Sequence, residues 1–261
     1  MGCGMSATRL GVLVDAVMSA ADDCCRLVRV SGDTARLTRG GQWTVRDTAV
    51  HLIGFSKIYA ALLADHSSPV SKIEEFDVVN QAMFMVLDGT DPGELADELF
   101  AATLEFCARA ATLDDEAVRP WHLGLELPVV DHVALIGNEL LMHGWDIAAV
   151  TGNESAAVDA ATPVVEQLAT LWPGFFRTDL GDGVRFALHV SGLRPVVYVF
   201  GNGTLRLETE SPLGETDCAT TGSAMNHLLW LGGRATLADS DLIVAGDRPE
   251  LADLFGFPLS T

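Results

Sequence analysis

Residues 138–148 read NELLMHGWDIA and place an acid and a histidine about one helical turn apart. Side chains four residues apart in an α-helix differ by about 40° around its axis, so Glu139 and His143 share one face. His143 also lies on an apolar stripe that runs through residues 129–150, which predicts that this face points into a hydrophobic core. A buried carboxylate is costly unless it is paired, hydrogen-bonded or bound to a metal ion. The stretch therefore predicts a helix whose buried face carries a functional pair.

Three further segments before this helix carry the same helical period of apolar residues. One begins near Leu10, one follows Thr44 with Asp47 at the capping-box position, and one follows Asp91 with proline as its first residue. Together with the helix over 128–152, these segments predict a four-helix bundle. The stretch 65–90 is interpreted as a longer connection that contains some helix of its own.

The pattern changes after a fifth helical segment, which ends at Trp172-Pro173-Gly174. Apolar and polar residues alternate from there on, and Asn202-Gly203 is typical of a hairpin turn. Strands are predicted at 184–190, 196–200 and 204–208, a helix at 223–231, and a further helix or strand at 235–244. The sequence thus predicts a helical domain over 1–174 and a small α+β domain over 175–261.

The composition excludes several classes of function. The net charge is −20 and the sequence pI is about 4.5, which disfavours nucleic acid or an anionic membrane as a partner. No run of eighteen apolar residues and no secretory leader is found, so we expect a cytoplasmic protein. The five cysteines lack CxxC spacing, which favours reduced thiols packed in the core. Phosphate-binding glycine motifs and a nucleophile elbow are also missing.

His51 is a third candidate ligand, because it lies between apolar positions one turn inside the second helix. A bundle that receives His51 from one helix and Glu139 with His143 from another offers three metal ligands and leaves coordination positions open. A hydrogen-bonded core histidine is the alternative for each imidazole, and the spacing of the pair also arises by chance. His132 lies about three turns before His143, too far to bind the same ion, and His122 precedes that helix.

Two motifs surround these residues: WTVRDTAVHL at 43–52 and NELLMHGWDIA at 138–148. They closely resemble the mycothiol-dependent maleylpyruvate isomerase family within the DinB-like metal-binding superfamily of actinobacteria. The resemblance covers the first 152 residues, and WLGGR at 230–234 with AGD at 245–247 is similar to the sterol-carrier-like tail of two-domain members. It implies an N-terminal DinB-like four-helix bundle followed by a small sterol-carrier-like α+β domain.

The resemblance also implies a function. His51, Glu139 and His143 correspond to the family's metal ligands, with zinc as the expected ion and nickel as the alternative. Mycothiol or a similar thiol would be activated for S-transfer to, or cis–trans isomerisation of, a small electrophile. Arg234 is the expected catalytic arginine of the C-terminal domain, or else an arginine that caps a helix. Several isomerase-type members have arginine where this chain has Ile136. The resemblance therefore supports the three metal ligands more strongly than it supports maleylpyruvate as the substrate.

Two alternative functions stay open at this point: a non-catalytic protein that binds a metal or small ligand, and a thiol-independent metallohydrolase. The oligomeric state is not predicted. Arg46 and Asp146 flank the ligands and could form a buried ion pair between two helices, while a capping role for Arg46 and a solvated Asp146 are the alternatives. Trp43 and Trp145 are interpreted as core residues or as walls of the site.

Overall fold

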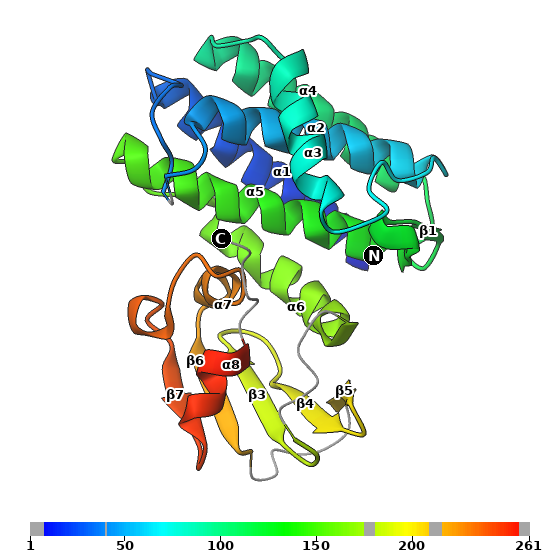
Figure 1. Ribbon diagram of the computed structural model, residues 1–261, viewed down its shortest axis with the longest axis vertical. Helices are drawn as coiled ribbons and strands as arrows, with labels where there is room; N and C mark the ends of the chain where they lie inside the picture. The colour runs from blue at the N-terminus through cyan, green and yellow to red at the C-terminus, as the bar shows by residue number, and fades with distance from the viewer. Residues whose placement is uncertain (1–7, 40, 175–180, 209–215, 256–261) are drawn as a thin grey trace, which may run out of the picture. The chain divides into compact units, whose positions relative to one another are not determined.

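The structure is a computed structural model that describes residues 8–39, 41–174, 181–208 and 216–255. The chain separates into two compact units, Met1–Pro163 and Val164–Thr261. The first unit is helical and the second combines helices with a sheet (Figure 1). This confirms the predicted class of a helical part followed by a mixed α and β part. The two units divide at residue 163, near the start of the helix over 161–171. The sequence predicted the boundary at residue 174, just after the end of this helix.

Four long helices form the first unit: α1 (Arg9–Val30), α2 (Val45–Leu63), α4 (Pro92–Ala110) and α5 (Val129–Thr151). Helix α1 packs against α4 and α5, and α2 packs against the same two helices. Their facing stripes bury leucine, valine and phenylalanine side chains such as Leu52, Leu99 and Phe106. Burial of these apolar stripes is the main force that holds a bundle together.

The ends of these helices follow the local chemistry of the sequence. The Thr44 hydroxyl accepts the Asp47 N–H and the Asp47 carboxylate accepts the Thr44 N–H, which completes a capping box for α2. Asp91 caps α4, and Gly152 ends α5 with φ at +69°. That left-handed conformation favours glycine because it lacks a Cβ.

Helix α3 (Glu75–Val86) lies in the connection between α2 and α4 and packs across α2 (Figure 1). Asn80 is its single buried residue. The Arg46 guanidinium donates to the carbonyl oxygens of Phe84, Leu87 and Gly89, so it ties the end of α3 to the first turn of α2. Arg46 therefore caps the neighbouring helix α3.

The connection between α4 and α5 folds into a hairpin that the sequence did not predict. Its strands β1 (Val118–Pro120) and β2 (Glu126–Pro128) pair antiparallel around the 3₁₀ turn η1 (His122–Gly124). Strands of three residues are too short to give a readable alternation.

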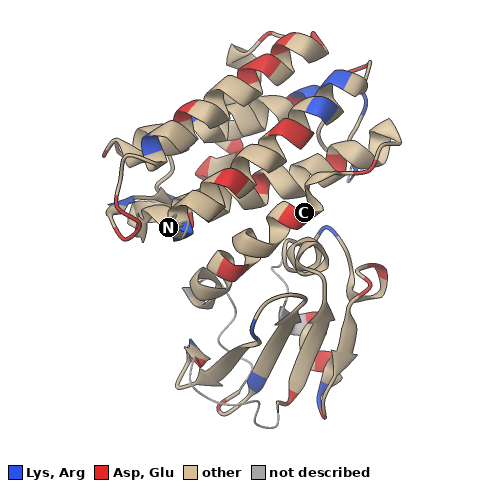
Figure 2. Cartoon of the chain, turned by 180° about the vertical axis from the view of Figure 1, so that it is seen from behind, with Lys and Arg blue, Asp and Glu red and all other residues tan. Residues whose placement is uncertain are grey.

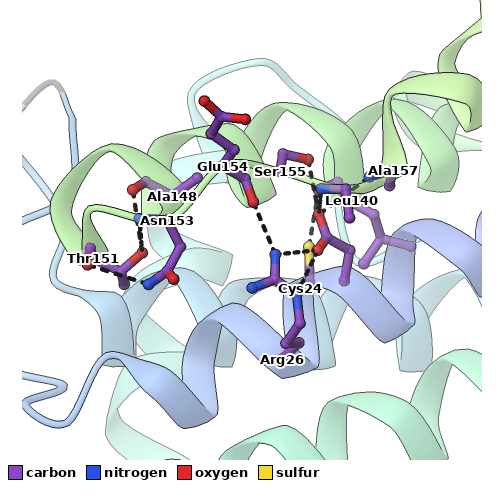
Figure 3. A network of polar contacts seen from close by, with 11 residues as sticks. Cys24, Arg26, Leu140, Ala148, Thr151, Asn153, Glu154, Ser155 and Ala157 are labelled. Atoms are coloured by element: carbon purple, nitrogen blue, oxygen red, sulfur yellow. Dashed lines mark hydrogen bonds and ion pairs between the residues drawn. The ribbon is translucent and has the colours of Figure 1, made fainter.

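A polar network joins α1 to the segment that follows α5 (Figure 3). The buried Asp23 carboxylate accepts hydrogen bonds from the Ser155 hydroxyl and from the backbone N–H of Ala156. Arg26 pairs with Asp23 at 2.6 Å and donates to the Glu154 carbonyl oxygen. The acid thus caps the start of the 3₁₀ helix η2 (Ala157–Ala160).

The second unit is built on one five-stranded sheet in the order β5-β4-β3-β6-β7. Strands β3 and β6 are parallel and the other neighbours are antiparallel. Asn202 and Gly203 both have positive φ, which confirms the predicted hairpin turn. The strands are β3 (Arg185–Val190), β4 (Val196–Gly201), β5 (Thr204–Glu208), β6 (Cys218–Gly222) and β7 (Ile243–Ala245).

The remaining helices are α6 (Ala161–Leu171), α7 (Ala224–Leu231), α8 (Ala252–Phe255), η3 (Trp172–Gly174), η4 (Leu237–Asp239) and η5 (Pro249–Leu251). The sequence predicted either a helix or a strand over 235–244, and this segment contains η4 and the start of β7. Strand β6 was not predicted, because its residues CATTG lack large apolar side chains.

Acidic side chains are spread over the helices of the bundle and outnumber basic ones (Figure 2). Among the described residues, no helix is both long and apolar enough to cross a membrane. Cys24, Cys25, Cys107 and Cys218 are buried free thiols, as the packing interpretation predicts, and Cys3 lies outside the described residues.

Candidate metal centre

Three ligand atoms from two helices converge inside the bundle. His51 projects from α2, and Glu139 and His143 project from α5. Their candidate ligand atoms all lie within 4.8 Å of one another. Glu139 Oε2 is 3.3 Å from His51 Nε2 and 3.4 Å from His143 Nε2. The structure therefore brings together the three residues that the sequence singled out.

The three side chains differ in their access to solvent. The exposed fractions are 5% for the His51 side chain and 6% for His143, but 25% for Glu139. The Glu139 side chain is therefore partly exposed, while both imidazoles are enclosed.

In each imidazole the nitrogen that does not contact Glu139, Nδ1, makes a hydrogen bond to another side chain. His51 Nδ1 lies 3.0 Å from Asn80 Oδ1, and His143 Nδ1 lies 3.1 Å from Asp146 Oδ2. Both acceptors favour a ring proton on Nδ1, so a cation could take the place of the proton that each Nε2 shares with Glu139 Oε2. Asp146 is buried, so the alternative that its carboxylate is exposed to solvent is wrong.

Aromatic rings form the walls of the cluster. Trp43 stacks against His143 with ring centroids 5.6 Å apart and lies 4.8 Å from His51. Phe55, one turn along α2, lies 4.4 Å from His51 on another side. Trp43 is thus a wall of the site, whereas Trp145 lies under the Arg39 guanidinium at 3.8 Å. These rings place apolar surface beside both imidazoles.

The electrostatics of the cluster favour a charged carboxylate. Burial raises the pKa of Glu139, but hydrogen bonds from His143 and His51 outweigh it and leave that pKa well below its usual range. Burial lowers the pKa of His51. Burial also opposes the charge on His143, yet hydrogen bonds to Asp146 and Glu139 raise its pKa overall. Glu139 is therefore the anionic member of the three.

The donor set suits a divalent metal ion. Two imidazole nitrogens and one carboxylate oxygen are the ligands of many catalytic zinc sites, and the same set accepts nickel. Anchored Nδ1 atoms and a carboxylate held in its charged form are features of such centres. Three protein ligands leave at least one coordination position for water or another molecule.

Other candidate residues lie outside this cluster. Arg234 follows α7 in the second unit and is half-buried. His132 lies on α5 and His122 in η1, and neither belongs to the three-residue set. Sequence reasoning missed Asn80, because it lies in a stretch interpreted mainly as a connection and no motif surrounds it. Asp146 stood in a recognised motif, yet its bond to His143 was not predicted.

Comparisons with known proteins agree with the fold. A solved mycothiol-dependent maleylpyruvate isomerase has a TM-score of 0.60 at 12% identity, covering 90% of this chain and 92% of that chain. A histidine-to-alanine mutant of that enzyme has a TM-score of 0.59 at the same identity and coverage. At this identity the likeness shows the fold. No curated protein matches the sequence significantly.

The family comparison is more specific. The model of the mycothiol maleylpyruvate isomerase N-terminal domain matches residues 14–148, which is more than half of the chain and includes all three candidate ligands. The chain therefore belongs to the mycothiol maleylpyruvate isomerase N-terminal domain family.

Proposed function

We propose that this protein is a metal-dependent enzyme that activates a low-molecular-weight thiol, mycothiol or a close relative, for reaction with a small electrophile. The observation that carries the proposal is the convergence of His51 Nε2, His143 Nε2 and Glu139 Oε2 within 4.8 Å, in a chain of this family. Zinc is the proposed ion and nickel the alternative. The reaction is S-transfer or cis–trans isomerisation.

The chemistry follows from the donor set and its surroundings. A bound zinc ion would favour the thiolate form of a thiol beside it, because an adjacent cation lowers the pKa of sulfur. The chain supplies two fixed imidazoles, an anionic carboxylate and the aromatic walls of Trp43 and Phe55. The thiolate sulfur then bonds to an electrophilic carbon. In transfer the leaving group departs with its electron pair. In isomerisation the sulfur would add to a C=C bond conjugated to a carbonyl group, whose oxygen takes up the π-electron pair. After rotation about the resulting single bond, this pair would re-form the double bond and expel the sulfur as thiolate.

We also propose that Arg234 assists the reaction, as the family resemblance implies. Replacement of Arg234 by alanine should lower turnover while the metal content stays unchanged. Arg206→Ala removes an exposed arginine from the same unit and is the matched control. Loss of metal or of folding in Arg234→Ala would contradict a role confined to the reaction.

Elemental analysis and a thiol assay test the proposal together. The purified chain should contain about one divalent ion per chain, and His51→Ala should lose it, whereas the exposed His66→Ala should keep it. The metal-loaded protein is then incubated with mycothiol and electrophiles that include monochlorobimane and maleylpyruvate. We expect thiol consumption by the wild type and by His66→Ala, and none by His51→Ala.

Other outcomes identify the alternative functions. If the purified chain binds no metal on titration, the proposed metal-dependent function is wrong. A metal-loaded chain that consumes no thiol with any electrophile indicates a non-catalytic binding protein. Turnover of an ester or amide that is independent of thiol indicates a metallohydrolase that activates water.

A further inference from the structure

Helix α3 meets the candidate metal centre through side chains from a single turn. The Asn80 amide oxygen lies 3.0 Å from His51 Nδ1, and the Phe84 ring meets the Trp43 ring edge to face at 5.5 Å. Met83 lies between Asn80 and Phe84, three residues after Asn80 and therefore on nearly the same face of the helix. The position of this turn thus decides whether the His51 imidazole keeps its hydrogen-bond partner.

The end of the Met83 side chain packs against the backbone of α2. It fills the space beside Gly54, where a Cβ would overlap the Met83 sulfur. Gly54 is three residues after His51, as Met83 is three residues after Asn80, so the two contacts are neighbours where α3 crosses α2. A change in the size or polarity of the Met83 side chain should therefore reach the contact of Asn80 with His51.

Met83 is also open to small solutes. The residue is partly exposed, whereas Met142 and Met225 have exposed fractions of 8% and 7%. A thioether is oxidised by low-molecular-weight peroxides, and the sulfoxide that forms is polar. Met83 therefore combines access for an oxidant with a packing role that the oxidised side chain cannot fill.

The described cysteines compete poorly for such an oxidant. They are buried free thiols at Cys24, Cys25, Cys107 and Cys218. Burial raises the pKa of Cys25 and Cys218 to about 11 and that of Cys107 to about 12. Burial also holds the pKa of Cys24 well above its usual value. The thiolate is the form that peroxides oxidise, so these protonated thiols react slowly.

We propose that Met83 is a modification site: its oxidation by hydrogen peroxide or a similar small peroxide detaches α3 from α2, removes the partner of His51 and weakens metal binding. A lone pair of the sulfur attacks one peroxide oxygen, so that an S–O bond forms and the O–O bond breaks. The departing oxygen carries away the electron pair and takes up the proton left on the sulfur-bound oxygen, which yields methionine sulfoxide and water. The inference rests on the proposed function, because it describes regulation of the same metal centre.

The sulfoxide oxygen has no place in the contact with α2. It needs a hydrogen-bond donor, but the N–H of Gly54 lies inside the helix and is used in its ladder. A polar atom that lacks a partner favours the solvent, so the oxidised side chain should turn outwards and carry the turn of α3 with it. Loss of the partner of a ligating histidine typically lowers metal affinity roughly 10–100-fold, and we expect an effect of this size.

Peroxide treatment followed by zinc titration tests the inference. All chains carry Cys3→Ser, which removes the cysteine outside the described residues. Peptide mass spectrometry locates the added oxygen, and competition with a chromophoric chelator measures zinc affinity before and after treatment. We expect oxidation of Met83 to lower the affinity roughly tenfold or more.

Two leucine variants separate Met83 from its neighbour. Met85 lies on the same helix and is 80% exposed, so Met85→Leu is the matched control. Peroxide should weaken zinc binding in Met85→Leu as in the parent chain and leave it unchanged in Met83→Leu. Met83→Gln, with a polar amide, should bind zinc weakly without peroxide. An equal loss in Met83→Leu, or full oxidation of Met83 with unchanged affinity, overturns the inference.

The metal-free chain separates this inference from the proposed function. Oxidation of Met83 should raise the rate of amide hydrogen exchange across residues 75–86 and shift the NMR signal of the His51 ring, with the exposed His66 unchanged. These changes support the inference even in a chain that consumes no thiol. A zinc-loaded, thiol-consuming chain in which oxidised Met83 leaves exchange and affinity unchanged supports the proposed function and overturns the inference.

Discussion

The anchoring of His51 and His143 is asymmetric. The Nδ1 partner of His143 is a buried carboxylate three residues away on the same helix, whereas that of His51 is a neutral amide on another helix. A carboxylate partner makes an imidazole a stronger base than an amide does. The two nitrogen ligands are therefore not equivalent, and His143 should be the stronger donor.

This difference predicts that substitutions of Asn80 and Asp146 lower metal affinity to different extents. Asn80→Ala and Asp146→Asn should each lower metal affinity by roughly 10–100-fold, as is typical for partners of ligating histidines. We expect Asp146→Asn to have the larger effect. Competition with a chromophoric chelator measures the affinity, and Gln81→Ala, an exposed neighbour on α3, is the control. Wild-type affinity in both variants would contradict the assigned roles.

The burial of His132 also predicts how stability depends on pH. The pKa of His132 is about 4 in the folded chain and about 6.5 when unfolded. As the pH falls below 6.5 the unfolded chain takes up a proton that the folded chain does not, so the free energy of unfolding decreases until the pH nears 4. His132→Phe should lose less stability than the wild type between pH 6.5 and 4.5, by about 2 kcal/mol. Urea unfolding with a chelator measures it, and His66→Gln should behave as the wild type.

Residue types, spacing and the two motifs were enough to predict that His51, Glu139 and His143 lie together, but not which residues make hydrogen bonds to the two imidazoles. His51, Glu139 and His143 lie on predictable helices, so the helical period and the two motifs place them. Asn80 reaches His51 only because α3 folds back across α2, a tertiary arrangement that no local pattern encodes.

Few buried side chains attach helix α3 to the bundle. Asn80 is its only buried residue, and its exposed side includes Val78, Met85 and Val86. The Met83 side chain reaches over Gly54 of α2, where a Cβ would lie 1.8 Å from the Met83 sulfur. Glycine at this position thus lets α3 approach α2 closely enough to place Asn80.

A double-mutant cycle tests this close approach. Gly54→Ala should force Met83 aside and cost about 1–3 kcal/mol of unfolding free energy, the range for overpacking. The same change in a Met83→Ala background should cost much less, because the space is then available. Chemical denaturation measures all four chains. Equal costs in both backgrounds would show that α3 does not pack on Gly54.

Elements with strong end signals were predicted well, and short elements were not. The capped starts of α2 and α4 were located from Thr44 and Asp91 because side-chain capping is a local interaction. Strand β6 is stabilised by pairing in parallel with the distant strand β3, so its formation depends on a tertiary partner rather than on its own pattern. Strands β1 and β2 pair with each other, but each has only three residues, too few for a readable pattern.

At the scale of the whole molecule, the candidate ligands all belong to one of the two compact units. A metal ion that binds only the folded state stabilises the unit that contains its ligands, by an amount set by concentration and affinity. The unit Val164–Thr261 contributes none of the three ligands, so we expect its stability to respond little.

Thermal unfolding with and without zinc measures this difference. At a free zinc concentration 100-fold above the dissociation constant, the bundle should gain about 2.7 kcal/mol. A chelator should reverse the gain, and His51→Ala should show none. Far-ultraviolet circular dichroism at the helical minimum follows the bundle. An equal gain in His51→Ala would place zinc elsewhere in the chain.

Because α3 buries only Asn80, its attachment to the bundle has a consequence for the kinetics of metal release. A helix that buries one side chain opens at a fraction of the free energy of global unfolding. Each opening withdraws Asn80 and frees the His51 ring to rotate, while α2 and α5 keep their positions. We expect the residence time of a bound ion to follow this local opening, so that amide hydrogen exchange across residues 75–86 and release of the ion share one rate.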